Sequence, residues 1–326
     1  MKNILVTGGA GYIGSHIIEI LIKKNLNIFI VDNLVTGHKK LINKKAKFFN
    51  CDIKNIRKLS RIIIKNKIDS IIHLAASLVI GEGERFPKKY YLNNVTGTYN
   101  LIKACEESLV KNFIFSSTAA VYSDKLKVVD EKSKIRPKSV YGKTKREAEK
   151  IIIRNFEKTD VNYAILRYFN VAGASSSGQI GLISKSDNLF KNISSEVIKK
   201  EPIIKIYGNN YKTKDKTPIR DFIHVSDLAE IHLKVLDKIS KHSTSIILNC
   251  GYNKKISVLD VVNEFKKQIK KKFIIKFQKR RAGDMEMIIA NNFKLKNFIK
   301  WKPKYSSLKQ IVKSCIKWEK KINKYL

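Results

Sequence analysis

The sequence predicts an α/β fold in which helices cover both faces of a parallel sheet. The first observation is the start of the chain, where an apolar strand at residues 2–7 leads into Gly8-Gly-Ala-Gly-Tyr-Ile-Gly14 and then into an apolar helix. The second is the alternation of strand and helix patterns through the first half, which is typical of a doubly wound sheet. The expected strands are residues 2–7, 27–31, 47–51, 70–73, 112–116 and 162–167.

The glycine-rich turn has the form of a dinucleotide-binding site. Gly9 is expected to make the tight turn, Gly11 to let the backbone approach a pyrophosphate, and Gly14 to allow close packing of helix on strand. The helix N-terminus adds its dipole and free N–H groups. The second strand ends in Asp32, which is placed to bind an adenosine ribose hydroxyl. This context favours a doubly wound Rossmann sheet over the alternative, a structural turn with a solvated aspartate.

A chain of 326 residues exceeds the usual size of one domain, so we expect two lobes. Residues 1–170 are assigned to the dinucleotide-binding domain, with a segment near 217–240 returning to it. Residues 171–326 are assigned mainly to a smaller, mixed α/β lobe that binds substrate. In the first lobe, a long helix after Pro87 and a helix at about 139–155 are expected to lie side by side on one face of the sheet.

In the second lobe, residues 173–181 are rich in glycine and serine and are expected to form a flexible loop. Ser257 and Asp260 have the spacing of a capping box ahead of an apolar helix, and Ser306 or Ser307 is expected to start a final helix. These features predict packing and carry no catalytic role.

Composition sets limits on the location and chemistry of the protein. The sequence has no signal-peptide pattern, and no apolar run approaches the roughly 20 residues that cross a bilayer, so we expect a soluble cytoplasmic protein without membrane contact. Cys51, Cys105, Cys250 and Cys315 are far apart and have no CxxC or His-rich neighbour. Neither a metal site nor a disulfide is therefore expected.

The formal net charge is +38, and a strongly basic chain commonly indicates a nucleic-acid partner or an anionic membrane surface. Only ten of the 66 basic residues are Arg, and the Lys are spread over nearly every expected element instead of forming one stripe with aromatic residues. With the high content of Ile and Asn, this pattern indicates a compositional drift toward A/T-rich codons. A nucleic-acid partner is therefore not expected, although a positive field still favours a dianionic substrate.

A candidate catalytic group follows the fifth expected strand. The strand end contains Ser116, Ser117 and Thr118, and Tyr141 and Lys145 follow on one face of a helix. A tyrosine base needs its pKa, normally near 10, lowered by about 3 units, and a lysine ammonium at about 4 Å supplies a contribution of that size. Thr118 is expected to hydrogen-bond the reacting oxygen. The alternative is a Tyr and a Lys on the helix surface without a catalytic role.

These residues resemble the extended short-chain dehydrogenase/reductase family and, within it, the UDP-galactose (UDP-glucose) 4-epimerases. The resemblance covers almost the whole chain. The matching segments are Thr7–His16, Asp32–Leu34, Cys51–Ile53, His73–Ala76, Tyr90–Gly97, Ser116–Thr118, Tyr141–Lys145, Leu166–Gly173, Ile206–Tyr211, Thr217–Leu228 and Arg280–Asp284.

The resemblance implies an epimerase that keeps NAD tightly bound and interconverts UDP-glucose and UDP-galactose through a transient 4-keto sugar. Tyr141 would remove the proton from the sugar 4-hydroxyl while hydride passes from C4 to NAD. The ketone would then turn over and receive hydride on its other face. UDP-GlcNAc and UDP-GalNAc are a further expected pair of substrates.

The resemblance also implies the roles of individual residues. The catalytic residues are Tyr141, Lys145 and Thr118. The residues that bind NAD are Gly8, Gly11, Tyr12, Ile13, Gly14, Asp32, Asn33, Asp52, Ile53, Leu74, Ala75, Ala76, Asn93, Ser116, Tyr141, Lys145 and Tyr168. The residues that bind the UDP-sugar are Thr118, Tyr141, Asn170, Asn188, Leu189, Ile206, Tyr207, Arg220, Arg281, Asp284 and Ile288. Arg suits the diphosphate because its donor fork binds two oxygens at once; the alternative for Arg220 and Arg281 is surface ion pairing with Asp221 and Asp284.

Four positions depart from the pattern of the family. Leu78 stands where Lys often contacts the cofactor, Lys216 replaces a usual glycine, and Asp187 stands where Asn is frequent. Ile288 occupies the position that limits room for an N-acetyl group, where a large aromatic side chain excludes it. Isoleucine is intermediate in size, so room for the acetamido group is expected.

The alternatives to an epimerase are a dehydratase and a nucleic-acid-binding protein, and the expected protein partner is a second copy of the chain. A nucleotide-sugar 4,6-dehydratase needs an added acid/base pair after the Ser/Thr strand end, where this chain has Ala119-Ala120. A nucleic-acid-binding pseudoenzyme would use the positive charge but has no need of Tyr141, Lys145 and Thr118. The resemblance further implies a homodimer, joined through the helix after Pro87 and the helix that contains Tyr141.

Overall fold

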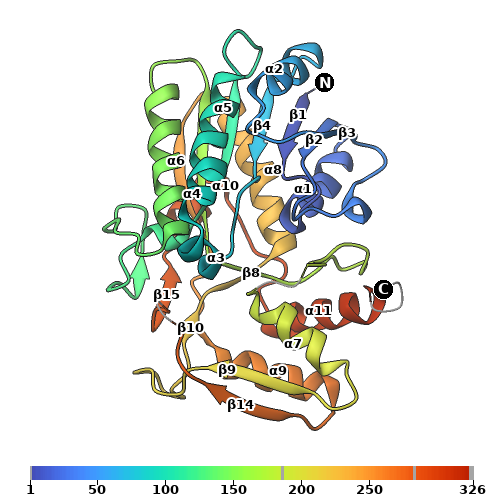
Figure 1. Ribbon diagram of the computed structural model, residues 1–326, viewed down its shortest axis with the longest axis vertical. Coiled ribbons are helices and arrows are strands. Elements are labelled where there is room, and N and C mark those ends of the chain that lie inside the picture. The colour runs from blue at the N-terminus through green and yellow to red at the C-terminus, as the bar shows by residue number, and fades with distance from the viewer. Residues whose placement is uncertain (1, 185–186, 282–283, 323–326) are drawn as a thin grey trace. The chain divides into compact units, whose positions relative to one another are not determined.

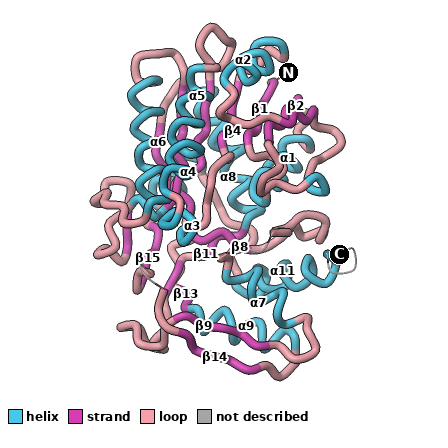
Figure 2. The backbone as a smooth tube through the Cα atoms, viewed as in Figure 1, coloured by secondary structure: helices cyan, strands magenta, loops and turns pink. Residues whose placement is uncertain are grey.

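The computed structural model describes residues 2–184, 187–281 and 284–322, and Figures 1 and 2 trace its helices and strands. The chain divides into two compact units. The first consists of Met1–Val121, Ile135–Tyr168 and Ala229–Leu248, and the second of Tyr122–Lys134, Phe169–Leu228 and Asn249–Leu326. Residues 122–134, expected in the first lobe, lie in the second unit because strand β6 (Val128–Val129) pairs there with strand β15 (Met287–Ala290).

A seven-stranded sheet forms the centre of the first unit, as the alternating pattern predicted. Its order is β12-β7-β5-β4-β1-β2-β3, and the pairs from β7 to β3 are parallel. This order places the topological switch point at β1 and β4, where open α/β sheets bind their ligands. The strands are β1 (Asn3–Thr7), β2 (Asn27–Asp32), β3 (Lys47–Asn50), β4 (Ser70–His73), β5 (Asn112–Thr118), β7 (Asn162–Tyr168) and β12 (Ile246–Cys250).

Side-chain alternation along the strands directs each helix to one face of this sheet. Val31 of β2 belongs to the core cluster that includes α2, α5 and α6, whereas its neighbour Ile30 lies with Ile18 of α1 beside Gly9. In Figure 1, α1 and α8 lie on one side of the sheet and α5 and α6 on the other. The bounds of these helices are α1 (Tyr12–Ile22), α2 (Ile56–Lys65), α3 (Ile80–Arg85), α4 (Pro87–Tyr91), α5 (Gly97–Lys103), α6 (Val140–Phe156) and α8 (Val225–His242).

The long helix expected after Pro87 is interrupted, because a π-helical segment at Leu92–Thr96 separates α4 from α5. Asn94 lies in this segment, where its amide donates to the Ser77 carbonyl at 3.0 Å and to the Thr144 hydroxyl at 3.0 Å. Such π-bulges often occur at functional sites. The bond to Thr144 joins the segment to α6, and the predicted side-by-side placement of the two helices is confirmed.

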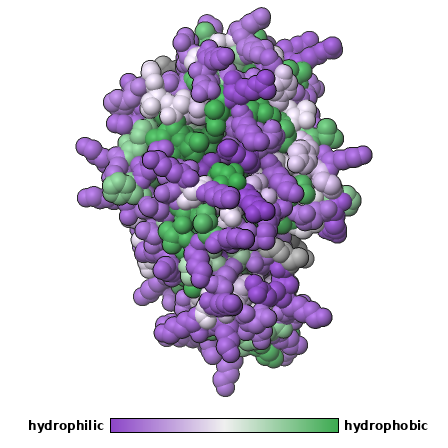
Figure 3. Space-filling model, turned by 90° about the vertical axis from the view of Figure 1, so that its left-hand side faces the viewer, coloured by the Kyte–Doolittle hydropathy of each residue, from purple (hydrophilic) through white to green (hydrophobic). Residues whose placement is uncertain are grey.

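Four large apolar side chains face solvent, one from the residue before α4 and the others from α4, the π segment and α5. They are Phe86, Tyr91, Leu92 and Tyr99, which are 54%, 42%, 55% and 41% exposed, and we call them the apolar face. Figure 3 shows hydrophobic side chains gathered among hydrophilic ones on the side of the molecule that carries these helices. Scattered apolar residues are normal on a protein surface, whereas a gathered group often marks an interface.

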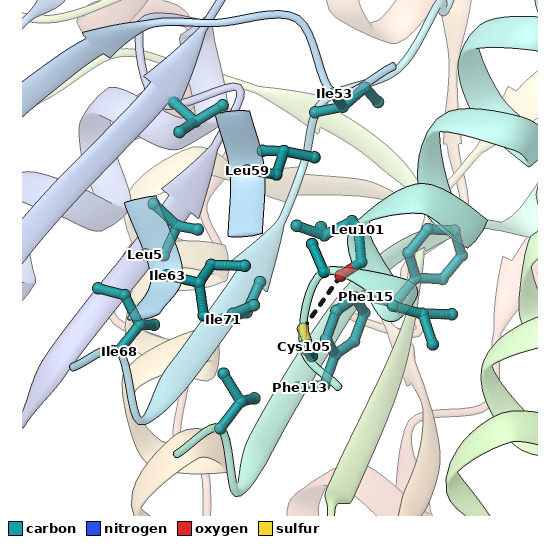
Figure 4. Packing of buried hydrophobic residues seen from close by; sticks show 14 of the residues in the cluster. Leu5, Ile53, Leu59, Ile63, Ile68, Ile71, Leu101, Cys105, Phe113 and Phe115 are labelled. Carbon is teal, nitrogen blue, oxygen red and sulfur yellow. Dashed lines mark hydrogen bonds between the residues drawn. The ribbon is translucent and has the colours of Figure 1, made fainter. Parts of the chain in front are cut away.

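The core of the first unit lies between the sheet and the helices α2, α5 and α6. Figure 4 shows Leu5, Ile71 and Phe113 from the strands facing Ile63 of α2 and Leu101 of α5. Cys105 fills this layer as a small apolar side chain, and its thiol donates to the Leu101 carbonyl at 3.1 Å. The core therefore holds the carboxyl ends of β1, β4 and β5 in fixed positions.

The second unit contains three short sheets and a group of helices. Its sheets have the orders β13-β10-β15-β6, β11-β8 and β14-β9. The elements are β8 (Asn170–Ala172), β9 (Ile203–Tyr207), β10 (Ile219–Arg220), β11 (Phe222–His224), β13 (Ile256–Ser257), β14 (Ile274–Gln278), α7 (Leu189–Val197), α9 (Val258–Ile269), α10 (Phe293–Ile299) and α11 (Leu308–Ile322). The predicted capping box of Ser257 and Asp260 is confirmed at the start of α9. Residues 173–181 form neither helix nor strand, as expected of a loop.

None of the helices within the described ranges is both long and apolar enough to span a membrane.

Candidate active site

The glycine-rich turn connects β1 to α1 at the switch point of the sheet. Gly8 has a φ of +73°, a conformation that L side chains rarely adopt, and a Cβ there would lie 2.8 Å from the Ala75 backbone nitrogen. Gly14 must also lack a side chain, because its Cβ would lie 2.5 Å from the Gly8 carbonyl oxygen. The close packing expected at Gly14 is thus present.

The tight turn lies one residue earlier than expected. Gly9 does not have a positive φ, and a Cβ there would meet the side chains of Ile30 and Ile18 at 2.8 and 2.9 Å. Gly9 is therefore a packing position, and the tight turn belongs to Gly8. A Cβ on Gly11 would meet only the Gly8 carbonyl oxygen, at 3.1 Å, so the outer side of the turn is open near Tyr12 and Ile13.

Two carboxylates follow the ends of β2 and β3. Asp32 accepts from the Ala10 N–H at 3.0 Å and from the Leu34 N–H at 2.8 Å. It is 7% exposed, and burial raises the pKa of its carboxyl above the usual range, against the effect of these two bonds. Asp52 is more exposed and accepts from the Asn33 amide at 3.1 Å. The order of the sheet places these two carboxylates on neighbouring strands.

The backbone passes close to the Asp32 carboxylate at Gly37. A Cβ on Gly37 would lie 2.6 Å from the Asp32 carboxylate, so the chain approaches it at a distance that only glycine allows. A carboxylate acceptor at a strand end beside a glycine-rich turn is the arrangement that binds the ribose hydroxyls of a dinucleotide. These residues fit the cofactor that the sequence predicted.

The segment after β4 lines the same end of the sheet. Leu74, Ala75 and Ala76 are half-buried. The Ser77 N–H donates to the Asn94 side-chain oxygen Oδ1 at 2.7 Å, and the Asn93 side-chain amide donates to the Ser77 hydroxyl at 3.1 Å, which bonds Ser77 to the π segment. Leu78 is 58% exposed. Ile53 is 4% exposed and packs where a Cβ on Gly97 would lie, so its backbone is the part that can face a ligand.

The predicted catalytic residues meet at the start of α6 and the end of β5. Ser139 caps α6 by accepting from the Gly142 N–H at 3.1 Å, which places Tyr141 in the first turn of the helix. The Tyr141 and Thr118 hydroxyls hydrogen-bond one another. One turn later, Lys145 is 2% exposed and donates to the Ser116 carbonyl at 2.7 Å. The grouping of these side chains agrees with the sequence analysis.

The electrostatics of this group differ from the expectation. Burial raises the pKa of Tyr141 to about 12, and the bond to Thr118 opposes only part of this rise. Burial lowers the pKa of Lys145 to about 7, with Glu149 acting in the opposite direction. The Lys145 ammonium donates to the Ser116 carbonyl, and the pKa of Tyr141 is set by burial and by Thr118, so Lys145 does not lower it as the spacing suggested.

Tyr168 lies at the end of β7, beside Thr118 in the register of β5 and β7. It is 7% exposed, and its hydroxyl lies 2.5 Å from Nε2 of His232 on α8. This pairing fixes the ring of Tyr168 at the same strand end as the catalytic group. Its position fits the predicted packing beside a nicotinamide.

In the second unit, three arginines lie near polar or aromatic partners. Arg220 pairs with Asp284 at 3.7 Å, and the Arg281 guanidinium lies 4.1 Å from the centre of the Tyr207 ring. The neighbouring Arg280 stacks on Tyr211 at 3.8 Å. Arg220 therefore forms an ion pair, but with Asp284 and not with the adjacent aspartate. A guanidinium that stacks on a ring through its face can still donate from its N–H edge to oxygen anions.

The other predicted substrate residues of the second unit take structural positions. Asn188 caps α7 by accepting from the Lys191 N–H, and its amide donates to the Val171 carbonyl. Leu189 is the first residue of α7, and Ile206 is 1% exposed in β9. Asn170 is exposed and pairs with Phe222 in the β8–β11 register. Ile288 is 2% exposed and lies opposite Arg220 in the β10–β15 register, while Asp187 and Lys216 are exposed.

The Arg220–Leu228 segment contains buried anchors that the sequence analysis did not identify. The Asp221 carboxylate accepts from the backbone of Tyr252, Asn253 and Ala290, and burial raises its pKa to about 6. Asp227 accepts from the Tyr252 hydroxyl and from the Lys304 and Tyr305 N–H groups. The sequence signal for these anchors is a pair of acidic residues within an apolar strand-to-helix segment. Asp221 and Asp227 tie β10, β15 and the C-terminal segment together.

Glu149 was also missed. It lies on the buried face of α6, four residues after Lys145, and it pairs with Arg167 of β7 at 2.8 Å. A glutamate on the core face of an amphipathic helix is the sequence signal that could have identified Glu149.

Among the described residues, no group of three or more His, Cys, Asp or Glu side chains could hold a metal ion. The four cysteines are free and buried.

Comparisons with known proteins place the chain in a family. The model of the NAD dependent epimerase/dehydratase family matches residues 4–251. The chain is 37% identical over 319 residues to the UDP-glucose 4-epimerase of Lactobacillus helveticus, covering 97% of each.

Two solved structures of 4-epimerases are also similar to the chain. The UDP-glucose-4-epimerase from Stenotrophomonas maltophila, with bound NAD and formylated UDP-arabinopyranose, is 29% identical with a TM-score of 0.96 and full coverage of both chains. The UDP-Glc/GlcNAc 4-epimerase from Campylobacter jejuni is 38% identical with a TM-score of 0.85, covering 98% of this chain and 100% of that one. The chain belongs to the NAD-dependent epimerase/dehydratase family.

Proposed function

We propose that this protein is an NAD-dependent nucleotide-sugar 4-epimerase that interconverts UDP-glucose and UDP-galactose. The observation that carries this proposal is the group at the end of β5, where the Tyr141 and Thr118 hydroxyls hydrogen-bond and Lys145 lies one turn along α6. Tyrosine and threonine hydroxyls can share the proton of a sugar hydroxyl, and a buried lysine supplies positive charge. Relatives with 33–37% identity over nearly the whole chain carry the name UDP-glucose 4-epimerase.

The first unit offers the groups that NAD requires. The open side of the turn at Gly11 to Gly14 and the N-terminus of α1 would hold the pyrophosphate. Asp32 would bind the adenosine ribose and Asp52 the adenine, with Leu74 to Ala76, Asn93 and Tyr168 nearer to the nicotinamide. A carboxylate at Asp32 repels a 2′-phosphate, which favours NAD over NADP.

When bound, NAD supplies a nicotinamide that takes hydride from C4 of the sugar and returns it. Tyr141 removes the proton from the 4-hydroxyl, and Thr118 holds the same oxygen. Lys145 provides positive charge beside them while it is protonated. Because the pKa of Tyr141 is about 12 without cofactor, the tyrosine requires added positive charge before it can act as a base near pH 7.

The second unit offers groups that suit a uridine diphosphate. Arg220 and Arg281 would bind the diphosphate, since a guanidinium fork binds two oxygens at once, and Asp284 would bind the uridine ribose. Asn170, Asn188 and Leu189 would complete the nucleotide contacts, with Ile206 and Tyr207 beside the base. Anchoring at the diphosphate leaves the sugar free to rotate, which a 4-epimerase needs.

The rival 4,6-dehydratase is less well supported. Thr118 is followed by the short helix Ala119–Val121, so the position of the added acid/base pair holds two alanines. A mass measurement separates the two reactions, because a dehydratase product lacks one water and an epimer has the mass of its substrate.

UDP-GlcNAc and UDP-GalNAc are proposed as additional substrates. A structural relative with 38% identity is described as a UDP-Glc/GlcNAc 4-epimerase. Ile288 is smaller than tyrosine and lacks a hydroxyl, which supports room for an acetamido group on its side of the pocket. A group met by packing alone changes selectivity by only about 10–200-fold, so activity on both pairs is favoured over strict exclusion.

The apolar face supports a homodimer. Phe86, Tyr91, Leu92 and Tyr99 expose large side chains just before α4 and on α4, the π segment and α5, which pack beside α6. Two copies that join these helices would cover side chains that otherwise remain in water. A cytoplasmic location is supported by the four free, buried cysteines, which suit a reducing compartment.

The test of the proposal is the cofactor content of the purified protein. A cofactor that is restored in every cycle has no need to leave, so we expect about one NAD per chain after denaturation and analysis of the released nucleotide. Turnover of UDP-galactose should need no added cofactor. A protein that holds no nucleotide and needs added NADP would contradict the proposal, and salt-sensitive DNA binding by such a protein would favour the pseudoenzyme.

A further inference from the structure

A buried carboxylate lies one helical turn beyond the proposed catalytic lysine. Glu149 on α6 is fully buried and accepts from the Ser117 hydroxyl at 2.5 Å. Arg167 donates to both of its oxygens, through Nε at 2.9 Å and Nη2 at 2.8 Å, and Arg146 donates at 2.9 Å. We call these four residues the Glu149 cluster. Glu149, Arg167 and Arg146 were assigned no role in binding or catalysis above, and Ser117 was named only as part of the Ser/Thr end of β5.

The cluster joins three elements next to the proposed catalytic residues. Ser117 lies between Ser116, whose carbonyl accepts from Lys145, and Thr118, which bonds Tyr141. Arg167 directly precedes Tyr168 and pairs with Ser117 in the register of β5 and β7. One carboxylate thus ties the catalytic ends of β5 and β7 to α6.

Stability alone gives a weak reason for such a cluster. Burying a carboxylate and a guanidinium costs several kcal/mol of desolvation per ion, and well-packed apolar side chains often stabilise a fold as well or better. A buried charge near a reacting group has another effect, because residues four apart on a helix are neighbours and charges inside a protein act strongly on one another. Lys145 and Glu149 have this spacing.

The groups around Lys145 determine whether its pKa is raised or lowered. From α6, Tyr141 is neutral at neutral pH, and Glu149 raises the pKa of Lys145 against the lowering by burial. From β5, the ammonium meets the Ser116 carbonyl and lies 4.7 Å from the centre of the Phe115 ring. From β4, buried His73 has a pKa of about 3 and is neutral at neutral pH, held between Thr7 and Thr98. On β7, Arg167 is paired with Glu149.

We propose that Glu149 is a positioning residue for the epimerisation proposed above: it fixes the ends of β5 and β7 against α6 and keeps Lys145 protonated during turnover. The positive charge of Lys145 is required while Tyr141 carries negative charge. Removal of the carboxylate would therefore cause activity to be lost at a lower pH than in the wild type, where deprotonation of Lys145 sets the alkaline limb of the kcat profile.

The test compares the kcat profiles of variants from about pH 6 to pH 10. Glu149→Gln keeps the shape of the side chain and removes its charge. We expect its alkaline limb to move down by about 1 pH unit or more, with KM for the UDP-sugar little changed. Glu147→Gln is the matched control, since it removes a carboxylate from the solvent-facing side of the same helix, and its profile should coincide with that of the wild type.

A second variant separates charge from folding. Glu149→Gln removes the negative charge that faces the buried Arg167 guanidinium, which can unfold the protein, whereas Glu149→Gln combined with Arg167→Met removes both charges. In the folded double variant the alkaline limb should still lie below that of the wild type. A wild-type limb in whichever of these variants folds would overturn the proposal. Wild-type turnover in the same assay tests the epimerase function itself, so the two failures are distinguishable.

Discussion

At the scale of single residues, the account depends on the ionisation of Tyr141. With a pKa of about 12, Tyr141 is almost entirely neutral at pH 7. Lys145 has a pKa of about 7 and is only partly protonated there. The cationic nicotinamide of oxidised NAD and the protonated lysine must together supply the missing stabilisation. In the proposed mechanism, the tyrosine would therefore act as a base only when NAD is bound.

The first prediction concerns Tyr141→Phe. The variant keeps the ring and the packing of α6 but lacks the hydroxyl that transfers the proton, so kcat should fall by about 10²–10⁴-fold. Binding of the UDP-sugar, measured by calorimetry, should be nearly unchanged. Turnover at the wild-type rate would remove the tyrosine from the mechanism.

The second prediction concerns substrate breadth. Ile288→Tyr should lower kcat/KM for UDP-GlcNAc more than for UDP-glucose, by about 10-fold or more, because the larger ring occupies the space of the acetamido group. Both values are measured on the same preparation. Ile288 is 2% exposed, so equal losses on both substrates would identify it as a packing position.

Several residue-scale features could not be predicted from the sequence. The glycine pattern predicted a turn, but the positive φ belongs to Gly8 because that residue passes closest to Ala75 of the next loop. The ion pair of Arg220 with Asp284 depends on a contact over 64 positions of the chain, which local spacing does not reveal. The expected lowering of the Tyr141 pKa by Lys145 was wrong because spacing on a helix carries no information about burial.

At the scale of elements, the strands were predicted well because buried parallel strands are short apolar runs with glycine or polar residues at their ends. The start of α6 was predicted at about residue 139, and in the structure the Ser139 hydroxyl accepts a hydrogen bond from the Gly142 N–H there. The π segment was not predicted, since its signal is a tertiary bond from Asn94 to Thr144 and not a local pattern. β6 was not predicted to join the second unit, because two residues carry too little periodicity to assign a strand.

The third prediction tests the capping box of α9. Ser257 accepts from the Asp260 N–H at 2.9 Å, and the Asp260 carboxylate accepts from the Ser257 N–H at 2.9 Å. Ser257→Ala should lower the free energy of unfolding by about 0.5–2 kcal/mol, seen as a lower urea midpoint. Lys255→Ala changes an exposed neighbour and should leave the midpoint within about 0.5 kcal/mol of the wild type. Equal effects of the two changes would show that the cap contributes nothing.

At the scale of the whole molecule, the net charge of +38 opposes the association of two copies. Like charges on two surfaces repel over about 8 Å at physiological salt, and added salt screens them. The apolar face favours association, because its side chains leave water in a dimer. The balance of these two effects sets the strength of the proposed dimer.

The fourth prediction is that the wild type sediments as a dimer at micromolar concentration and associates more tightly as salt is raised. Leu92→Asp places a charge in the apolar face, where Leu92 is 55% exposed, and should shift the protein to monomers. Phe293→Asp, a change at a position that is 69% exposed on α10, should leave the dimer intact. A wild type that remains monomeric at both low and high salt would contradict the proposed interface.

The measurement that tests the central claim most directly is the reaction of the purified protein with UDP-galactose and, separately, with UDP-glucose, followed by proton NMR and mass spectrometry without added cofactor. The fifth prediction is that both reactions reach the same mixture of the two sugars, with no change in mass. A product lighter by one water, or two sugars that remain unchanged in protein shown to hold NAD, would contradict it.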